Sequence, residues 1–303
     1  MGTLGFKILI TGSNGLLGQK IVKRCIKYNI PFIASSLGEN RNSKCPSENY
    51  CSLDISDVDQ IRNLFEKYQF TSIIHTAAIT NVDYCELNEA ECKKVNVDAT
   101  NSLFEQAKKY DCHFQLLSTD FVFNGEKGNY SESDSKAPLS IYAKSKVDAE
   151  DLLLNSTYQN WSIVRTIIVY GTGESLTRSN LILWALESLP KNQEMKLVND
   201  QFRAPTWADD LAYACVEIIL KKKKGIYHIS GPVTRSVDQI VLEVAAELGI
   251  QNPIIETISS LSLNQPAKRP PKTGFDLTKA KNELNYHPKD IRDAVKILIK
   301  ELI

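Results

Sequence analysis

A tyrosine and a lysine in the segment SIYAKSKVDAE have a spacing that suits proton transfer. Tyr142 and Lys146 stand four residues apart at the start of a stretch with helical periodicity, so both side chains lie on one face of the predicted helix. A nearby ammonium favours the phenolate and lowers the pKa of the phenol, which suits a general acid or base near neutral pH. A surface tyrosine stacked on a lysine stem would have the same spacing, so the pair needs support from elsewhere in the chain.

Two hydroxyl side chains end an apolar run upstream of this pair. In LLSTDFVFNG, Ser118 and Thr119 follow residues typical of a buried strand. Ligands of open α/β sheets bind at the carboxyl ends of the strands. A hydroxyl group there can hydrogen-bond the carbonyl oxygen of a substrate and hold it against the phenol.

A glycine-rich turn lies near the N-terminus. Gly12, Gly15 and Gly18 recur in ITGSNGLLG directly after an apolar run, and apolar residues follow at helical spacing. The glycines therefore stand where a strand passes into a helix, a place where backbone N–H groups and the helix dipole bind a pyrophosphate. A tight turn that binds nothing is the alternative, and the residues downstream argue against it.

These candidates need a scaffold that brings strand ends together. Apolar runs alternate with helical stretches, which predicts an α/β fold with a Rossmann-type, doubly wound parallel sheet. Strands are expected at 7–10, 32–35, 72–75, 114–118, 162–168 and 225–229. Helices are expected from residue 15 and at 61–68, 89–110, 143–154, 180–189 and 237–248. We predict a Rossmann domain at 1–170, with 205–230 returning to it, and a smaller, discontinuous substrate-binding region at 171–204 and 231–303.

Composition excludes several partner classes. The 303 residues balance 36 Lys and Arg against 36 Asp and Glu, so no net field attracts nucleic acid or an acidic membrane. No apolar run approaches the roughly 20 residues that span a bilayer, and we expect a cytoplasmic protein without membrane or nucleic-acid partners. The seven cysteines are scattered, which favours free thiols and gives no metal site.

Taken in order, the motifs resemble the extended short-chain dehydrogenase/reductases. The segments TGSNGLLG, HTAAITNVDYCE, STDFVFNG, YAKSK and IVRTIIVYG carry the likeness. In finer detail the chain is similar to the dTDP-4-dehydrorhamnose reductase family: AAITNVDYCE resembles AAYTAVDKAE, STDFVFNG resembles STDYVFDG, and NDQFRAPTWADDLA resembles DQxGxPTxxxDLA. The resemblance covers residues 7–284. It implies NAD(P)H-dependent reduction of the 4-keto group of a nucleotide-linked 6-deoxysugar. The best single guess for the substrate is dTDP-4-dehydrorhamnose. The product would be dTDP-L-rhamnose, a precursor of cell-surface polysaccharide.

The resemblance also implies roles for residues at matching positions. Tyr142 would give a proton to the C4 oxygen as the nicotinamide delivers hydride, Lys146 would bind the nicotinamide ribose and lower the phenol pKa, and Thr119 would orient the substrate. The expected cofactor-binding residues are Gly12, Ser13, Asn14, Gly15, Leu16, Leu17, Gly18, Ser36, Arg41, Asp54, Ile55, Ala77, Ala78, Tyr142, Lys146 and Val169. The expected substrate-binding residues are Ser118, Asn180, Gln201, Arg203, Thr206 and Arg269. Arg203 departs from the family pattern, which has glycine there. Arg203 and Arg269 could each pair with a nucleotide diphosphate, or each could be a solvated or salt-bridged arginine.

The residues after the second strand bear on the choice between NADP(H) and NAD(H). FIASSL ends without an acid, and Arg41 and Lys44 follow. Ser36 and Arg41 suit the 2′-phosphate of NADP because a guanidinium binds phosphate with two hydrogen bonds, so NADP(H) is favoured. Glu39 could instead reach a ribose hydroxyl, which leaves NAD(H) open. Magnesium occurs at a dimer contact in the family; no glutamate cluster here requires it, and a homodimer stays open.

Three other functions are known for chains that resemble these reductases. A 4,6-dehydratase would need an Asp-Glu pair after the catalytic threonine, which Asp120 and Phe121 do not supply. A nucleotide-sugar epimerase would share Thr119, Tyr142 and Lys146. The β subunit of methionine adenosyltransferase also resembles these reductases and acts by binding a partner enzyme, so the fold alone does not prove turnover.

Overall fold

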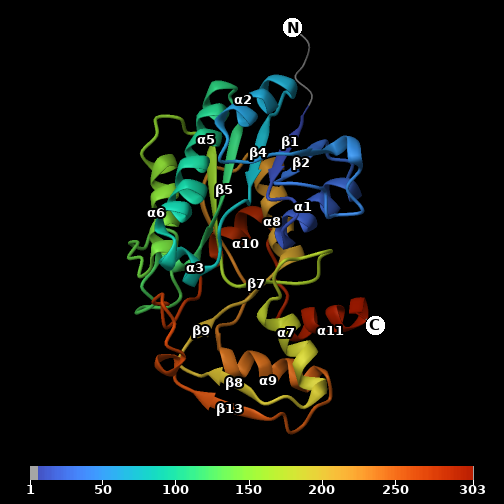
Figure 1. The fold of residues 1–303 in the computed structure, drawn as a ribbon, viewed down its shortest axis with the longest axis vertical. Coiled ribbons are helices and arrows are strands. Elements are labelled where there is room, and N and C mark those ends of the chain that lie inside the picture. Colours follow the sequence, from blue (N-terminus) through green and yellow to red (C-terminus); the bar gives the residue numbers. More distant parts are fainter. Residues whose placement is uncertain (1–5, 303) are drawn as a thin grey trace.

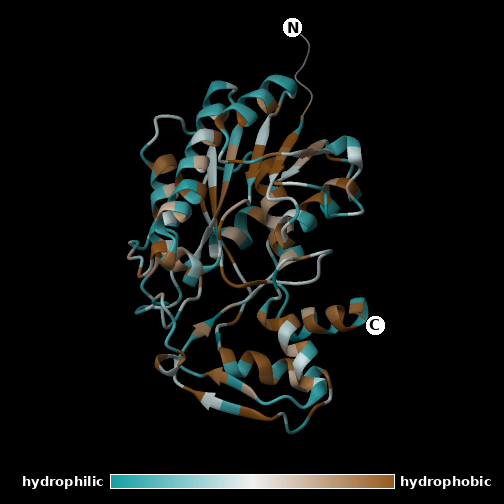
Figure 2. Ribbon diagram, viewed as in Figure 1, coloured by the Kyte–Doolittle hydropathy of each residue, from teal (hydrophilic) through white to brown (hydrophobic). Residues whose placement is uncertain are grey.

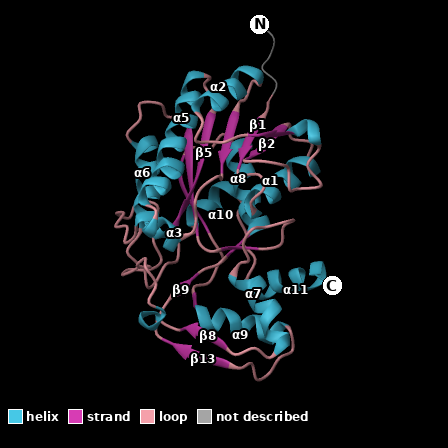
Figure 3. Cartoon of the chain, viewed as in Figure 1, coloured by secondary structure: helices cyan, strands magenta, loops and turns pink. Residues whose placement is uncertain are grey.

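A parallel sheet forms the centre of the larger part of the molecule (Figures 1 and 3). The structure is a computed structural model that describes residues 6–302. Seven parallel strands follow the order β11-β6-β5-β4-β1-β2-β3. They are β1 Ile8–Thr11, β2 Phe32–Ser36, β3 Tyr50–Ser52, β4 Ser72–His75, β5 His113–Thr119, β6 Trp161–Thr166 and β11 Gly225–Ile229. The predicted Rossmann-type sheet is confirmed, and the strand order reverses between β1 and β4, where such sheets bind ligands.

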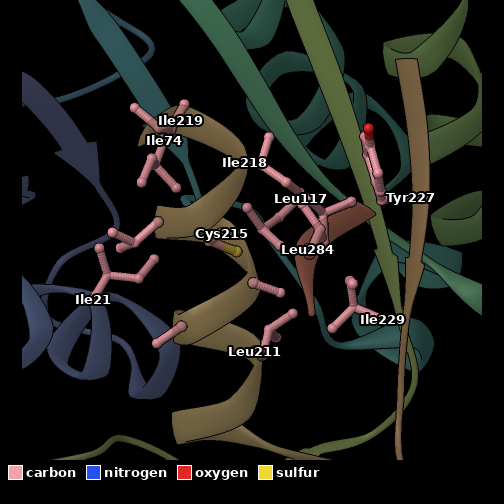
Figure 4. Close-up of a cluster of buried hydrophobic side chains, with 14 of the residues drawn as sticks. Ile21, Ile74, Leu117, Leu211, Cys215, Ile218, Ile219, Tyr227, Ile229 and Leu284 are labelled. Carbon is pink, nitrogen blue, oxygen red and sulfur yellow. The ribbon is translucent and has the colours of Figure 1, made fainter. Parts of the chain in front are cut away.

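Helices cover both faces of this sheet (Figure 1). On one face α1 Leu16–Lys27, α8 Ala208–Leu220 and α10 Thr278–Leu284 contribute to one apolar cluster, and on the other α2 Val58–Lys67, α5 Ala99–Lys109 and α6 Ile141–Leu154 contribute to a second. Helix α8 packs against the sheet because its apolar residues lie on one face: Leu211, Cys215 and Ile218 recur at helical spacing and are fully buried. Figure 4 shows them packed near Leu284. Hydrophobic residues concentrate on the central strands in Figure 2, whereas the outer helices carry most polar residues.

The remaining elements lie mostly at the carboxyl ends of the strands. A third apolar cluster gathers residues of α7, α9, α11 and β8, with Trp207 and Tyr170 against them. The elements are α3 Val82–Leu87, α4 Glu89–Lys93, α7 Leu181–Ser188, α9 Val237–Glu247, α11 Ile291–Leu302, β7 Val169–Tyr170, β8 Met195–Val198, β9 Phe202–Arg203, β10 Thr206–Trp207, β12 Arg235–Ser236 and β13 Ile255–Ile258, with short helical turns η1 Ser47–Asn49, η2 Lys94–Asp98, η3 Asp120–Val122, η4 Leu189–Lys191 and η5 Ser260–Leu263.

The structure departs from the sequence-based expectations in three places. Strand β3 was not expected, because its three residues are only half-buried or exposed and carry no apolar run. The stretch 89–110 is interrupted by the π-helical turn η2. Phe275, Leu277 and Leu284 pack in the cluster beneath the sheet, although 231–303 was assigned to the substrate region. None of the helices within residues 6–302 is long and apolar enough to cross a membrane.

Candidate active site

The candidate site is a cleft of about 680 Å³ at the carboxyl ends of β1, β4 and β5. It lies beside the reversal in strand order, as expected for an open α/β sheet. The sequence-predicted residues that line it are Gly12, Asn14, Gly15, Leu16, Leu17, Gly18, Ser36, Arg41, Ala77, Ala78, Ser118, Thr119, Tyr142, Lys146, Val169 and Asn180. Residues from the glycine turn, from α6 and from the segment after β7 therefore share one cavity.

The glycine turn is packed too closely for side chains. Gly12 has a φ of +70°, and a Cβ there would lie 2.7 Å from the backbone nitrogen of Ala77; a Cβ on Gly18 would overlap the carbonyl of Gly12. Helix α1 begins at Leu16 without a side-chain cap or an acidic residue in its first turn. Its free N–H groups and positive dipole end therefore face the cleft, which fits a pyrophosphate.

Asn14 fixes the loop that follows β2. Its backbone nitrogen donates to Ser36 Oγ at 2.9 Å, its side-chain nitrogen donates to the Glu39 carbonyl at 2.8 Å, and its side-chain oxygen accepts from the Arg41 amide at 2.9 Å. Tyr50 donates to the Gly38 carbonyl at 2.7 Å. These contacts place Ser36 and Arg41 in the lining of the cleft, whereas Glu39 does not line it.

Residues 172–179, here called the strap, are tied to the elements around this turn. Gln19 and the backbone of Glu174 exchange two hydrogen bonds of 2.8 Å. The Glu174 carboxylate accepts from the Ser43 amide at 2.7 Å and from its hydroxyl at 2.9 Å. The strap therefore joins α1 to the loop after β2, and its residues 176–179 line the cleft.

Tyr142 and Lys146 lie on the buried face of α6, which Ser140 caps. Tyr142 is 8% exposed and Lys146 is 4% exposed. Burial raises the pKa of Tyr142 well above its usual value, and the Thr119 hydroxyl acts in the opposite direction. Burial also lowers the pKa of Lys146 to about 8, which Glu150 and then Cys92 partly offset. The expected lowering of the phenol pKa by Lys146 is not what this arrangement shows, because desolvation dominates.

Both predicted hydroxyl groups point their protons at carboxylates. Ser118 Oγ donates to Glu150 at 2.6 Å, and Thr119 Oγ1 donates to Asp120 at 3.1 Å. Asp120 is buried, its pKa is raised by burial, and it accepts a second hydrogen bond from Thr273. Thr119 Oγ1 also accepts from the Phe121 amide at 3.2 Å, so its hydroxyl proton must turn away from Asp120 before it can be donated to a substrate carbonyl.

The π-helical turn η2 carries Asn96, which belongs to the segments that resemble the extended short-chain dehydrogenase/reductases but was given no role in the predicted site. Buried Asn96 accepts from the Ile79 amide at 2.8 Å and donates to the Ile79 carbonyl at 3.0 Å and to Ser145 Oγ at 3.1 Å. It thereby joins the loop after β4 to the helix that carries Tyr142. Such single π turns are frequent at functional sites.

Seven other predicted residues do not line the cleft: Ser13, Asp54, Ile55, Gln201, Arg203, Thr206 and Arg269. Ser13 is buried against Ser36. Asp54 instead accepts from the Ser56 amide, Ile55 packs against the α2 and α5 side of the core, and the Gln201 carbonyl accepts from Val237.

Two predicted arginines are already engaged. Arg203 is 2% exposed and donates to the backbone carbonyls of Phe202, Pro270 and Pro271. Arg269 forms an ion pair of 2.7 Å with Asp83. Neither guanidinium therefore faces the cleft in this structure.

Thr206 has a supporting position behind the cleft. Its hydroxyl donates to the Ile167 carbonyl at 2.6 Å, and its amide contacts the carbonyls of Ile167 and Ile168. Ile168 has a φ of +31°, a costly conformation for a β-branched residue. Thr206 thus holds a strained turn that directs Val169 into the lining.

Arg178, which the sequence reading did not select, lines the cleft from the strap. Within residues 6–302 it forms no ion pair or hydrogen bond, so its guanidinium is free to bind an anion. The contact with Cys92 and burial raise the pKa of Cys85, and the positive charge of Arg178 partly offsets this rise. Cys85 packs beside Tyr142. Arg178 therefore acts near the catalytic end. No group of three or more His, Cys, Asp or Glu side chains in the described part of the chain could hold a metal ion.

Comparison with known proteins decides the family. A family model described as the RmlD substrate binding domain matches residues 6–303. The chain belongs to this family. It is 30% identical over 304 residues to a protein named dTDP-4-dehydrorhamnose reductase from Aggregatibacter actinomycetemcomitans, covering 96% of this chain and 97% of that protein.

Solved structures agree with this assignment. A dTDP-4-dehydrorhamnose reductase from Clostridium acetobutylicum has a TM-score of 0.86 and 27% identity, covering 98% of this chain and 99% of that one. A Bacillus anthracis protein of that name, in complex with NADP, has a TM-score of 0.84 at 22% identity, covering 98% and 99%. The predicted class, an NAD(P)-dependent oxidoreductase of the extended short-chain type, is confirmed.

The regulatory alternative also has relatives. Methionine adenosyltransferase 2 subunit beta from Pongo abelii is 25% identical over 278 residues, covering 90% of this chain and 81% of that protein. Relatives of this chain therefore also include proteins named as a subunit of another enzyme.

Proposed function

We propose that this protein reduces the 4-keto group of a nucleotide-linked 6-deoxysugar with NADPH, converting dTDP-4-dehydrorhamnose to dTDP-L-rhamnose. The observation that carries the proposal is that Thr119, Tyr142 and Lys146 line the same cleft as the uncapped N-terminus of α1. The names of the relatives support the sugar nucleotide. A cytoplasmic location and the absence of nucleic-acid partners remain predictions from the sequence, and a homodimer and a use of magnesium stay open.

The cofactor would supply a hydride to the sugar C4. The N-terminus of α1 would hold the pyrophosphate, Ser36 and Arg41 would bind a 2′-phosphate, and Lys146 would hydrogen-bond the nicotinamide ribose. Because burial raises the pKa of Tyr142, the phenol keeps its proton at neutral pH and can give it to the C4 oxygen. Thr119 would orient that oxygen.

Arg178 is proposed as the partner of the substrate diphosphate. Arg203 and Arg269 are held by other residues, and Arg41 and Lys146 lie toward the expected cofactor. Arg178 is the remaining lysine or arginine in the described lining of the cleft. A diphosphate that enters beside the strap would meet this guanidinium.

An epimerase and a partner-binding module remain the rival functions. An epimerase would use the same tyrosine and lysine but return the hydride to the sugar, so no net NADPH would be consumed. A module would bind cofactor without turnover.

The test is consumption of NADPH or NADH with freshly prepared dTDP-4-dehydrorhamnose, with the product identified by NMR. We expect dTDP-L-rhamnose and a higher rate with NADPH. Tyr142→Phe should lower kcat by about 10²–10⁴-fold with NADPH binding intact, and Tyr158→Phe, which removes a hydroxyl bound to the Cys112 carbonyl, should not. Equal rates in Tyr142→Phe and the parent protein would exclude Tyr142 as proton donor.

A further inference from the structure

Glu150 is a buried carboxylate behind the cleft that the proposed chemistry does not yet use. Its exposed fraction is 0%. It lies on α6 four residues after Lys146 and eight after Tyr142, so the three side chains share one face of the helix. This face is turned toward the end of β5, where Ser118 lies.

Two cationic side chains and one hydroxyl contact this carboxylate. Arg165 donates from Nε at 2.9 Å and from Nη2 at 2.7 Å, Ser118 Oγ donates at 2.6 Å, and Lys136 Nζ lies 3.6 Å away. Arg165 and Glu150 therefore form a buried ion pair. Lys146 lies four residues before Glu150 on the same helix, and the negative charge of Glu150 raises its pKa against the larger effect of burial.

We propose that Glu150 is a positioning residue of the reaction, which fixes the Ser118 hydroxyl at the floor of the cleft and keeps the neighbouring Lys146 protonated. The inference rests on the proposed role of Lys146 in binding the nicotinamide ribose. Without Glu150, the buried Lys146 ammonium would lose the stronger of the two charges that offset its burial, and it would lose its proton at a lower pH.

Of the other titratable groups around Lys146, Cys92 alone also supports its positive charge. Tyr142 on α6 is neutral near pH 7, since burial raises its pKa. His75 on β4 is neutral as well, because burial lowers its pKa to about 3. Cys92 on α4 is the one competitor: its contact with Cys85 lowers its pKa to about 7, so its thiolate also supports Lys146.

The experiment measures NADPH affinity by fluorescence between pH 6 and 10, and kcat/KM over the same range. The variants are Glu150→Gln, Glu150→Asp and Cys92→Ala. The matched control is Glu243→Gln, because Glu243 is also paired with an arginine, Arg235 at 2.8 Å, but lies on α9 away from the cleft. In the parent protein, binding should weaken as pH rises through the pKa of Lys146 near 8.

This loss of NADPH binding at high pH is here called the alkaline limb. We expect it to move to lower pH by roughly one unit in Glu150→Gln. The shift should be smaller in Glu150→Asp and in Cys92→Ala. It should not move in Glu243→Gln. A folded Glu150→Gln protein with an unmoved limb overturns the inference. If Glu150→Gln does not fold, the Glu150→Asp variant decides. An unchanged pH dependence of NADPH binding in folded Glu150→Asp would then overturn the inference.

The binding profile needs no sugar, so it separates this inference from the proposed function. A parent protein that binds NADPH but reduces no sugar would contradict the proposed function. The pH dependence of NADPH binding would still test the role of Glu150.

Discussion

At the residue scale, the positive charge available to a substrate differs from the sequence expectation. Arg203 and Arg269 were assigned to a diphosphate, but their guanidinium groups bind backbone carbonyls and Asp83. Those partners lie far away in the sequence, so no local pattern reveals them. Arg178 stands in a loop of no regular structure, and only the fold shows that this loop borders the cleft.

Replacing Arg178 should weaken substrate binding selectively. We expect Arg178→Gln to raise the Kd of dTDP, measured by calorimetry, by about tenfold, because a charge-assisted hydrogen bond contributes about 1.5–3 kcal/mol before solvent exposure reduces it. The Kd of NADPH should stay unchanged. Arg292→Gln, which removes an exposed arginine of α11, is the control. An unchanged Kd for dTDP in Arg178→Gln would remove Arg178 from the proposed site.

At the element scale, the strap closes over the segment where α1 begins. Its ties to Gln19 and Ser43 join three parts of the chain that are distant in sequence. A dinucleotide that extends from Arg41 to Lys146 would pass beside these ties. The glycine turn and the Tyr142–Lys146 pair were predictable because each depends on local spacing, whereas the strap depends on loop contacts that carry no periodic signal.

Breaking the Glu174 tie should speed cofactor release. Glu174→Gln weakens two hydrogen bonds to Ser43 by removing the acceptor's charge. We expect the NADPH dissociation rate, measured by stopped-flow displacement, to rise a few-fold while the association rate changes less. Glu187→Gln, an exposed glutamate of α7, should leave both rates unchanged. Equal dissociation rates in Glu174→Gln and the parent protein would show that the tie does not retain the cofactor.

At the scale of the whole molecule, the sheet order and two apolar layers follow from patterns that the sequence displays. Six of the seven strands were expected close to their observed bounds. Strand β3 was missed because Tyr50–Ser52 has no buried apolar run, and with it Tyr50, whose hydroxyl helps to shape the loop after β2. The π turn around Asn96 was missed because the stretch 89–110 was treated as one continuous α-helix, without a shift in its apolar spacing at residues 94–98.

Three buried histidines should make the fold sensitive to acid. Burial lowers the pKa of His75 and of His228 to about 3 and that of His113 to about 4. The unfolded chain binds protons at these groups near pH 6.5 and the folded chain does not, so stability falls as pH drops from about 6.5 to 4. Asp120, whose pKa burial raises, acts in the opposite direction.

Urea unfolding at stepped pH values would measure this slope. Each histidine contributes up to about 1.4 kcal/mol per pH unit within that window. His113→Gln should flatten the slope, since one titrating group is removed. A free energy of unfolding that stays constant from pH 6.5 to 4 would contradict the burial of these imidazoles.

The central claim is that the cleft transfers hydride from the cofactor to the sugar C4. The most direct test incubates the protein with dTDP-4-dehydrorhamnose and NADPH deuterated at the reactive nicotinamide carbon, and locates the label by NMR. We predict one deuterium at C4 of dTDP-L-rhamnose, and none when Tyr142 is replaced by Phe over the same time. A product without deuterium, or a sugar epimerised without net oxidation of NADPH, would contradict the account.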